Sequence, residues 1–323
     1  MKPFEQNERV LFVGDSITCH GGFMSYIQEY YLTHCPEKRV LCFNAGVSGG
    51  TAVSANRYLE ADLALFRPTA AVLMLGMNDM GRGASYFEGD GNITEEKIRH
   101  NQIFFKEMAV LAERLAQKGL SLIFCTPTPF DDGMETETPA GKKIADTLFA
   151  YGCYVRGLAE KYAAPVVDFF TPMVVLNEKM QRQDKTLSLI GKADRVHPTD
   201  LGHAVMARLF LREQGFTDVE EPTVQTVMNG TAALTVSAKN ALRKETEVIT
   251  RNLRNTVYFA MGEDWNEPLA HRYAAMDKYM EDEKAGVPHN PYITNLVAHY
   301  RDHAEEEETL KRHLVDLTER LYD

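Results

Sequence analysis

A serine, a histidine and an aspartate stand where they could form a hydrolytic triad. Ser16 lies in "GDSIT" directly after an apolar run, and His197 lies in "ADRVHP" with Asp194 three residues before it. A hydroxyl nucleophile needs a base to take its proton, and the base needs a third group to hold its tautomer. Asp194 can hold His197 if the segment forms a turn, since side chains at i and i+3 then face the same way. Pro198 fits such a turn because it keeps His197 out of the helical conformation.

Two further residues could stabilise the oxyanion that forms during acyl transfer. Gly46 lies in "NAGVSGG" and Asn78 lies in "GMND". A backbone N–H at Gly46 and the side-chain amide of Asn78 would supply two donors, and glycine leaves room for a substrate. Each segment follows a candidate strand, where open parallel sheets place their sites. Alone, however, "GDS" is typical of a polar turn that ends a strand, so the hypothesis depends on all four segments.

The elements that must position these residues alternate between apolar runs and amphipathic stretches. Candidate strands cover 9–14, 39–46, 70–76, 120–127 and 164–170, and candidate helices cover 54–65, 94–119, 141–163 and 200–214. The alternation is typical of βαβ units with a parallel sheet covered on both faces. The sequence therefore predicts a three-layer α/β/α domain with a five-stranded parallel sheet, and Thr94 is the expected N-cap of the longest helix.

A polar stretch with a proline, "TDVEEPTVQ", suggests a boundary near residue 221. We expect residues 1–221 to form the catalytic domain and residues 222–323 to form a helical C-terminal extension. Leu310, Leu314, Leu317 and Leu321 make one apolar stripe in the extension. Such a helix must bury its stripe on the domain or on another subunit, so the extension could be a lid or a homo-oligomerisation element.

Composition excludes several classes of partner. The net charge of −11 argues against nucleic acid and anionic membrane surfaces, which attract basic patches. The five cysteines are odd in number and form no C-x-x-C pair, as expected for reduced thiols. No segment resembles a signal peptide or approaches the roughly 18 apolar residues of a membrane span, so we expect a cytoplasmic protein. No set of side chains has metal-ligand spacing, and no metal or cofactor is expected.

Together, "GDSIT", "NAGVSGG", "GMND" and "DRVHP" resemble the four blocks of the SGNH (GDSL-type) hydrolases, in family order over about residues 7–216. The resemblance implies a flavodoxin-like α/β/α fold and ester hydrolysis through an acyl-enzyme without a cofactor. It also implies the roles of five residues: Ser16 as nucleophile, His197 and Asp194 as its partners, and Gly46 and Asn78 with the Ser16 N–H as the oxyanion hole.

More narrowly, "ADRVHPTDLGHAVMARLFLREQGF" is similar to intracellular acetylxylan esterases of this family. This similarity implies removal of acetyl groups from xylo-oligosaccharides. Many members carry an acidic residue directly after "GDSIT", where this chain has Cys19 followed by His20. These two residues, with Asp15 and Asp79, are candidates for the substrate pocket, although the pattern favours a structural role for Asp15, which would bond nearby backbone groups.

Three other functions remain open on the sequence alone. The chain could act on another short-chain acyl ester, such as pectin-derived acetyl sugars, lipids or thioesters. It could be a non-catalytic carbohydrate-binding protein that has kept the fold. It could also be an assembly protein in which the C-terminal helices dominate.

Overall fold

Five buried strands form a parallel sheet. In the computed structural model they are β1 (Arg9–Gly14), β2 (Leu41–Gly46), β3 (Ala70–Met74), β4 (Ser121–Cys125) and β5 (Val166–Val167). Their order is β2-β1-β3-β4-β5, and every neighbouring pair is parallel. Because nearly all strand residues are buried, helices must cover both faces of the sheet. The predicted five-stranded parallel sheet is confirmed.

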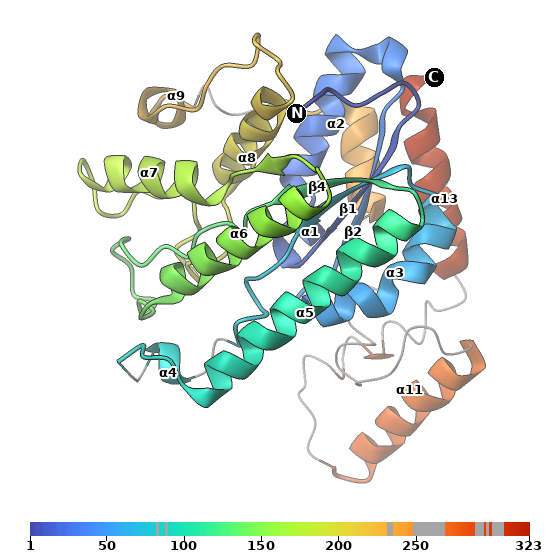
Figure 1. Cartoon of the computed structure of the whole chain (residues 1–323). Coiled ribbons are helices and arrows are strands. Elements are labelled where there is room, and N and C mark those ends of the chain that lie inside the picture. Colours follow the sequence, from blue (N-terminus) through green and yellow to red (C-terminus); the bar gives the residue numbers. More distant parts are fainter. Residues whose placement is uncertain are drawn as a thin grey trace. The chain divides into compact units, whose positions relative to one another are not determined.

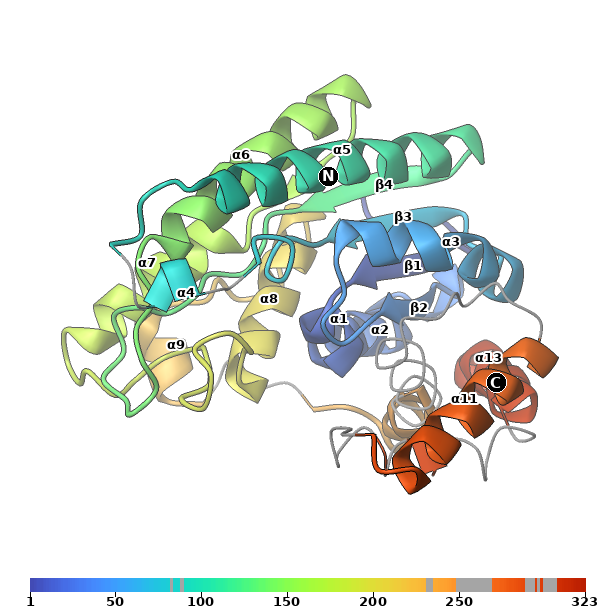
Figure 2. The same ribbon diagram turned by 90° about the horizontal axis from the view of Figure 1, so that it is seen from below.

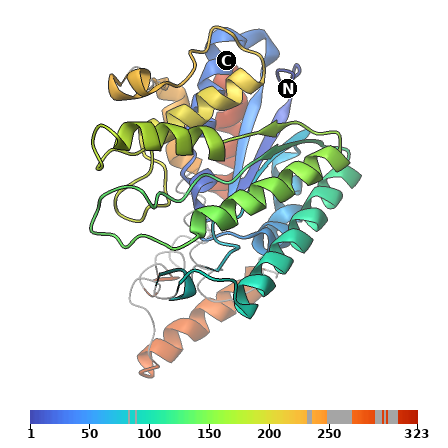
Figure 3. The ribbon, with the colours of Figure 1, turned by 60° about the vertical axis from the view of Figure 1, so that its left-hand side comes forward.

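Helices cover the two faces in pairs. Helices α2 (Gly22–His34) and α8 (Asp200–Glu213) pack together on one face, and α5 (Glu95–Gln117) and α6 (Ile144–Lys161) lie on the other (Figures 1 and 2). Figure 3 shows α5 and α6 side by side on their face of the sheet. The Thr94 side chain accepts from the Lys97 N–H and so caps α5, as predicted. The result is the three-layer α/β/α fold that the sequence predicts.

The remaining helices of this part connect the strands or follow the sheet. They are α1 (Ser16–His20), η1 (Pro36–Lys38), α3 (Ala52–Phe66), α4 (Ala84–Phe87), α7 (Phe170–Gln181) and α9 (Val224–Met228). The chain leaves β1 toward β2 on one side and returns to β3 on the other side. Such a reversal opens a crevice at the carboxyl ends of the strands. Ser16 follows β1 and Asn78 follows β3 at this edge.

The structure describes residues 1–81, 84–87, 90–230, 235–247, 269–287, 294, 297–298 and 307–323. The chain groups into two compact units, one with residues 1–56 and 68–237 and the other with residues 57–67 and 238–323. The division therefore falls after residue 237 and assigns most of α3 to the C-terminal unit, whereas the sequence suggested a boundary at residue 221.

The C-terminal unit is helical where it is described. Residues 238–247 are helical, and α11 (Leu269–Lys284), α13 (Glu307–Glu319) and η3 (Arg320–Tyr322) follow. Leu314 and Leu321 are buried, as the predicted apolar stripe requires. None of the five cysteines forms a disulfide. Within the described ranges, no helix is long and apolar enough to span a membrane.

Candidate active site

Ser16, His197 and Asp194 form one chain of hydrogen bonds across 181 residues of sequence. The Nε2 atom of His197 lies 2.8 Å from Ser16 Oγ, and its Nδ1 atom is bonded to Asp194 Oδ2. The Nδ1–H tautomer leaves Nε2 as an acceptor for the serine hydroxyl. The imidazole is therefore oriented to take a proton from Ser16.

A turn holds the aspartate against the histidine. Asp194 Oδ1 accepts from the backbone N–H groups of Val196 (2.9 Å) and His197 (3.1 Å). Burial alone would raise the pKa of Asp194, but the bonds from the His197 side chain and from the two backbone N–H groups outweigh it and lower the pKa. Asp194 thus remains a carboxylate and favours a protonated imidazole during the reaction.

Arg195 lies inside this turn, and the sequence analysis proposed no role for it. It is 4% exposed and adopts a left-handed backbone conformation with φ 62°. Its guanidinium donates to the carbonyl oxygens of Asp131, Met134 and Thr138 at 2.8 Å each. The segment that carries Asp194 and His197 is therefore fixed to the loop at 131–138. A long cationic side chain between two candidate catalytic residues was the available signal.

The N-terminus of α1 presents the serine. Asp15 is the N-cap of this helix, because its Oδ1 atom accepts from the Ile17 N–H at 2.9 Å. Ser16 is the first residue of the helix, and its N–H has no hydrogen-bond acceptor among the described residues. An N–H at this position can donate to a developing oxyanion.

Gly46 does not offer its N–H to the site in this structure. The residue ends β2, and its N–H donates to the side chain of Asn44 at 2.9 Å. A Cβ atom at Gly46 would lie 2.3 Å from the Cys19 backbone nitrogen. The glycine at this position thus allows β2 to lie close against α1, which is a packing requirement, and its amide is already used.

Gly49, three residues later, has an amide that is not used. It adopts φ 71°, a conformation that favours glycine, and no described residue accepts from its N–H. The loop around it lies against the end of β1, because Val47 N–H donates to Gly14 O at 3.0 Å. Asn78 reaches the same loop, since its side-chain nitrogen donates to Gly50 O at 3.0 Å. The structure therefore brings Ser16, Gly49 and Asn78 to one edge of the sheet.

The four candidate pocket residues differ in exposure. Asp15, Cys19 and Asp79 are buried, with 2%, 7% and 5% of their surface exposed. His20 is exposed, and its ring stacks on buried His203 with centroids 4.6 Å apart. Of the four, His20 is the one whose side chain is open to a solute.

A family comparison accounts for this arrangement. The model of the GDSL-like lipase/acylhydrolase family matches residues 12–205, which include Ser16, Asn78, Asp194 and His197. The chain belongs to this family. It is accordingly a carboxylic ester hydrolase, and the resemblance identified from the four sequence blocks is confirmed.

Acetylxylan esterases are among the proteins that are similar to this chain. One from Geobacillus stearothermophilus is 30% identical over 225 residues, which cover 65% of this chain and 94% of that protein. A solved catalytic mutant of Axe2, an acetylxylan esterase from the same organism, has a TM-score of 0.54 and 27% identity, and covers 69% of this chain and 100% of that one. A gut microbial diltiazem-metabolizing enzyme covers 99% of this chain and 97% of its own, with a TM-score of 0.75 and 20% identity. This last likeness shows the fold alone.

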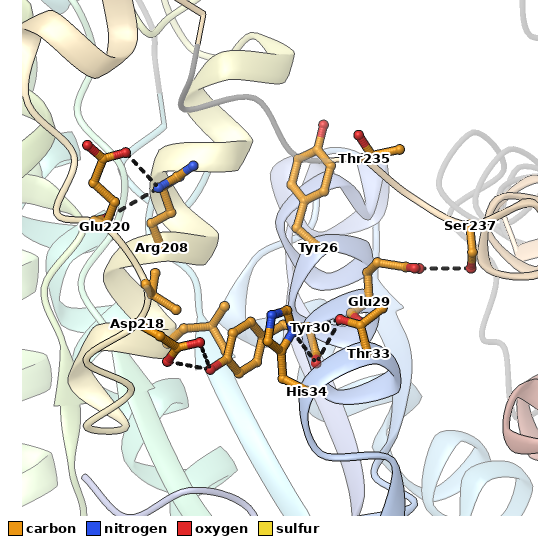
Figure 4. A pocket seen from close by; sticks show the side chains of 12 residues that line it. Tyr26, Glu29, Tyr30, Thr33, His34, Arg208, Asp218, Glu220, Thr235 and Ser237 are labelled. Atoms are coloured by element: carbon orange, nitrogen blue, oxygen red, sulfur yellow. Dashed lines mark hydrogen bonds and ion pairs between the residues drawn. The ribbon is translucent and has the colours of Figure 1, made fainter.

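A pocket of about 530 Å³ lies elsewhere in the N-terminal unit of this GDSL-like protein. Residues from α2 and α8 line it, together with residues 218–220 and two residues near 236 (Figure 4). Its polar groups bond to one another: the Tyr30 hydroxyl donates to Asp218, and Ser237 donates to Glu29 at 2.9 Å. None of the residues that the sequence suggested for the active site lines this pocket, so it has no part in the hydrogen-bond chain.

Proposed function

We propose that the protein is a serine esterase that removes acetyl groups from acetylated carbohydrates, with xylo-oligosaccharides as the preferred substrate class. The observation that carries this proposal is the chain of hydrogen bonds from Asp194 through His197 to Ser16. No metal or organic cofactor takes part in the proposed reaction.

In the first half of the reaction, Ser16 Oγ attacks the acetyl carbonyl carbon while His197 Nε2 takes the hydroxyl proton. Asp194 keeps the imidazole in the required tautomer and stabilises the imidazolium. The carbonyl oxygen becomes an oxyanion, which accepts hydrogen bonds from the N–H groups of Ser16 and Gly49 and from the Asn78 amide. Gly49 takes the role that the sequence suggested for Gly46, because the Gly46 N–H is bonded to Asn44.

Collapse of this intermediate releases the sugar and leaves an acetyl ester on Ser16. The His197 imidazolium protonates the sugar alkoxide as the carbon–oxygen bond breaks. Water then attacks the acetyl-enzyme, His197 takes the water proton, and a second oxyanion forms at the same donors. Its collapse returns the proton to Ser16 Oγ and releases acetate.

The substrate class is supported by the 30% identity to an acetylxylan esterase along almost the whole length of that protein. Two of the similar solved structures are catalytic mutants of Axe2, in one of which a serine is replaced by alanine and in the other an aspartate. These mutants support the roles proposed for Ser16 and Asp194. We assign to the exposed His20 a contact with the sugar, although one face of its ring already stacks on His203.

The test measures hydrolysis of p-nitrophenyl acetate by the wild-type protein and by Ser16→Ala. We expect the variant to lose activity by about 10³-fold or more, with an unchanged melting temperature, because the hydroxyl is the nucleophile. Ser237→Ala is a matched control, because this serine donates to Glu29 in the separate pocket and has no proposed role in the reaction. Full activity of Ser16→Ala would show that another residue is the nucleophile.

A second assay addresses the substrate. Acetate release is measured from acetylated xylo-oligosaccharides, acetylated pectin fragments, and p-nitrophenyl esters of increasing acyl length. We expect the highest kcat/KM for the acetylated xylo-oligosaccharides. Higher kcat/KM for longer acyl chains would instead identify a short-chain lipase or a general acyl esterase.

A further inference from the structure

Asn78 and its neighbour Asp79 both bind the segment that leads from β2 into α3. The Asn78 side-chain nitrogen donates to Gly50 O at 3.0 Å, and Asp79 Oδ1 accepts from Ala52 N–H at 2.8 Å. Two consecutive residues after β3 thus hold one segment at Gly50 and at Ala52. Gly49 immediately precedes Gly50.

The segment has few other attachments. Val47 N–H donates to Gly14 O at 3.0 Å, and Gly50 N–H donates to Val47 O at 2.8 Å. The first bond fixes the start of the loop to β1, and the second is internal to the loop. The Ser48 hydroxyl also donates to Cys19 Sγ at 3.7 Å, a long contact from the residue before Gly49. The backbone after Gly49 is held at Gly50 and at Ala52, both from the turn after β3, so these two points help to set the direction of the Gly49 N–H.

Asp79 is buried to a degree that a helix cap does not require. It is 5% exposed, and its Oδ2 atom is buried and has no hydrogen-bond partner in the part of the chain that the structure describes. Burial of a carboxyl oxygen without a partner costs free energy. Helix α3 also has a local cap, since Thr51 N–H donates to Ser54 Oγ and Ser54 N–H donates to Thr51 Oγ1. Capping alone therefore gives little reason to bury an acid here.

We propose that Asp79 is a positioning residue for the oxyanion hole. It holds Ala52 so that the loop from Val47 to Thr51 keeps the Gly49 N–H directed at the oxyanion, while Asn78 holds Gly50 and donates to the oxyanion itself. This inference rests on the proposed esterase function and replaces the expectation that Asp79 lines the substrate pocket. Asp79 acts on the reaction through the loop and touches no substrate.

Two substitutions of similar size separate this role from a structural one. Asp79→Asn keeps an oxygen that can accept from Ala52 N–H, so we expect kcat for p-nitrophenyl acetate within about threefold of the wild type. Asp79→Leu has no acceptor, and we expect kcat to fall by about 10- to 100-fold with KM within about threefold, because a misdirected donor acts on the transition state. The melting temperature of Asp79→Leu should not fall in proportion to the loss of kcat, since the change also removes a buried oxygen that has no partner.

Ala52→Pro tests the same hydrogen bond from its other side. Proline removes the N–H at the first position of a helix, where it is tolerated. We expect a loss of kcat similar to that of Asp79→Leu, and no further loss when the two changes are combined. If either variant fails to fold, the other still tests the inference.

Asp168→Leu is the matched control. Asp168 follows β5 at the same edge of the sheet, accepts from Thr126 Oγ1 at 2.9 Å and from Thr171 N–H at 3.3 Å, and lies outside the proposed site. We expect its kcat to be unchanged. Wild-type kcat in Asp79→Leu or in Ala52→Pro would overturn the positioning role. Failure of the esterase function itself would be recognised separately, by a wild-type protein without activity or by an active Ser16→Ala.

Discussion

Asp194 and Asp79 have pKa values that are shifted in opposite directions. Hydrogen bonds outweigh burial at Asp194 and lower its pKa. Burial dominates at Asp79 and raises its pKa to about 7, although the Ala52 N–H opposes this shift and the nearby Asp15 carboxylate adds to it. Asp194 therefore carries a negative charge beside His197, where the imidazolium needs it. The raised pKa means that Asp79 keeps its proton over a wider range of mildly acidic pH than an exposed aspartate does.

The raised pKa of Asp79 predicts how stability depends on pH. In the unfolded chain the carboxyl loses its proton near pH 4, whereas in the folded protein it keeps the proton up to about pH 7. Between these values the folded state binds more protons, so the free energy of unfolding falls as the pH rises. The contribution of Asp79 is on the order of a few kcal/mol, since one pKa unit corresponds to about 1.4 kcal/mol. Chemical denaturation at several pH values between 4.5 and 7.5 measures this fall.

Asp79→Asn is the comparison for that experiment, because asparagine cannot ionise. We expect the free energy of unfolding of the variant to fall less between pH 4.5 and pH 7.5 than that of the wild type. Parallel curves for the two proteins would mean that Asp79 ionises normally in the folded state.

Sequence reasoning at this scale predicted the three residues that the structure joins in one hydrogen-bond chain. For the oxyanion hole it predicted Asn78 and Gly46, whereas we propose Gly49 in place of Gly46. The segment "NAGVSGG" contains three glycines, and residue types alone do not tell which N–H is free. Which N–H has no acceptor depends on the Asn44 side chain, which accepts from the Gly46 N–H, and on the left-handed conformation of Gly49. Both are consequences of the folded loop.

At the scale of elements, one arginine links two loops that lie at the same edge of the sheet. The backbone of the turn with Asp194 and His197 is bonded to Gly191, and the Arg195 guanidinium joins the turn to three carbonyl groups of the loop at 131–138. A backbone hydrogen bond also joins the two loops, because Asp131 N–H donates to Arg195 O at 3.0 Å. The position of His197 relative to Ser16 therefore depends on the loop at 131–138.

Arg195→Met should disturb both stability and turnover. Loss of charged donors to buried carbonyl groups should lower the free energy of unfolding by about 2–4 kcal/mol. Displacement of the turn should lower kcat by about tenfold or more, with little change in KM. Arg195→Lys should recover part of the activity, since an ammonium can still reach some of the carbonyl groups. Urea denaturation and steady-state kinetics on p-nitrophenyl acetate measure these effects.

Arg156→Met is the control for that experiment. Arg156 pairs with Asp168 at 2.8 Å, but its side chain is 45% exposed, so the pair should contribute less than about 1 kcal/mol. We expect near-normal kcat in this variant. Equal effects of the two substitutions on kcat would argue against a specific role for Arg195.

The strands and the helices α3, α5, α6 and α8 were predictable because their signals are local, whereas α2 and α7 were not predicted. Continuous apolar runs predict strands that are buried on both faces, and a threonine before an amphipathic stretch predicts a capped helix. The short β5 shows the limit of this reasoning. Its predicted range was 164–170, but only Val166 and Val167 pair with β4, because pairing at a sheet edge depends on the neighbouring strand.

At the scale of the whole molecule, the chain has a part that the acetylxylan esterases lack. Those relatives match over 65–69% of this chain, while the diltiazem-metabolizing enzyme matches over 99% of it. The C-terminal unit includes residues 57–67, which contain most of α3 and lie far from residues 238–323 in sequence. A boundary placed by composition at residue 221 could not include them, because composition carries no information on long-range contacts.

Because the C-terminal unit takes in residues 57–67, we predict that residues 1–237 are not an independent domain. Tyr58, Leu59 and Phe66 of α3 are buried, and residues 57–67 group with the segment that a truncation after Ser237 would remove. Exposure of a large apolar side chain costs about 1.5–3 kcal/mol. We therefore expect the truncated chain to melt at a lower temperature than the full chain and to self-associate, as measured by differential scanning calorimetry and size-exclusion chromatography.

Co-expression of residues 238–323 as a separate chain should reverse both effects. Leu59→Gln with Phe66→Gln should reduce self-association of the truncated chain but destabilise the full chain, since only the full chain buries these side chains in a complete unit. A truncated chain that stays monomeric and has the same melting temperature as the full chain would show that α3 does not need the C-terminal helices.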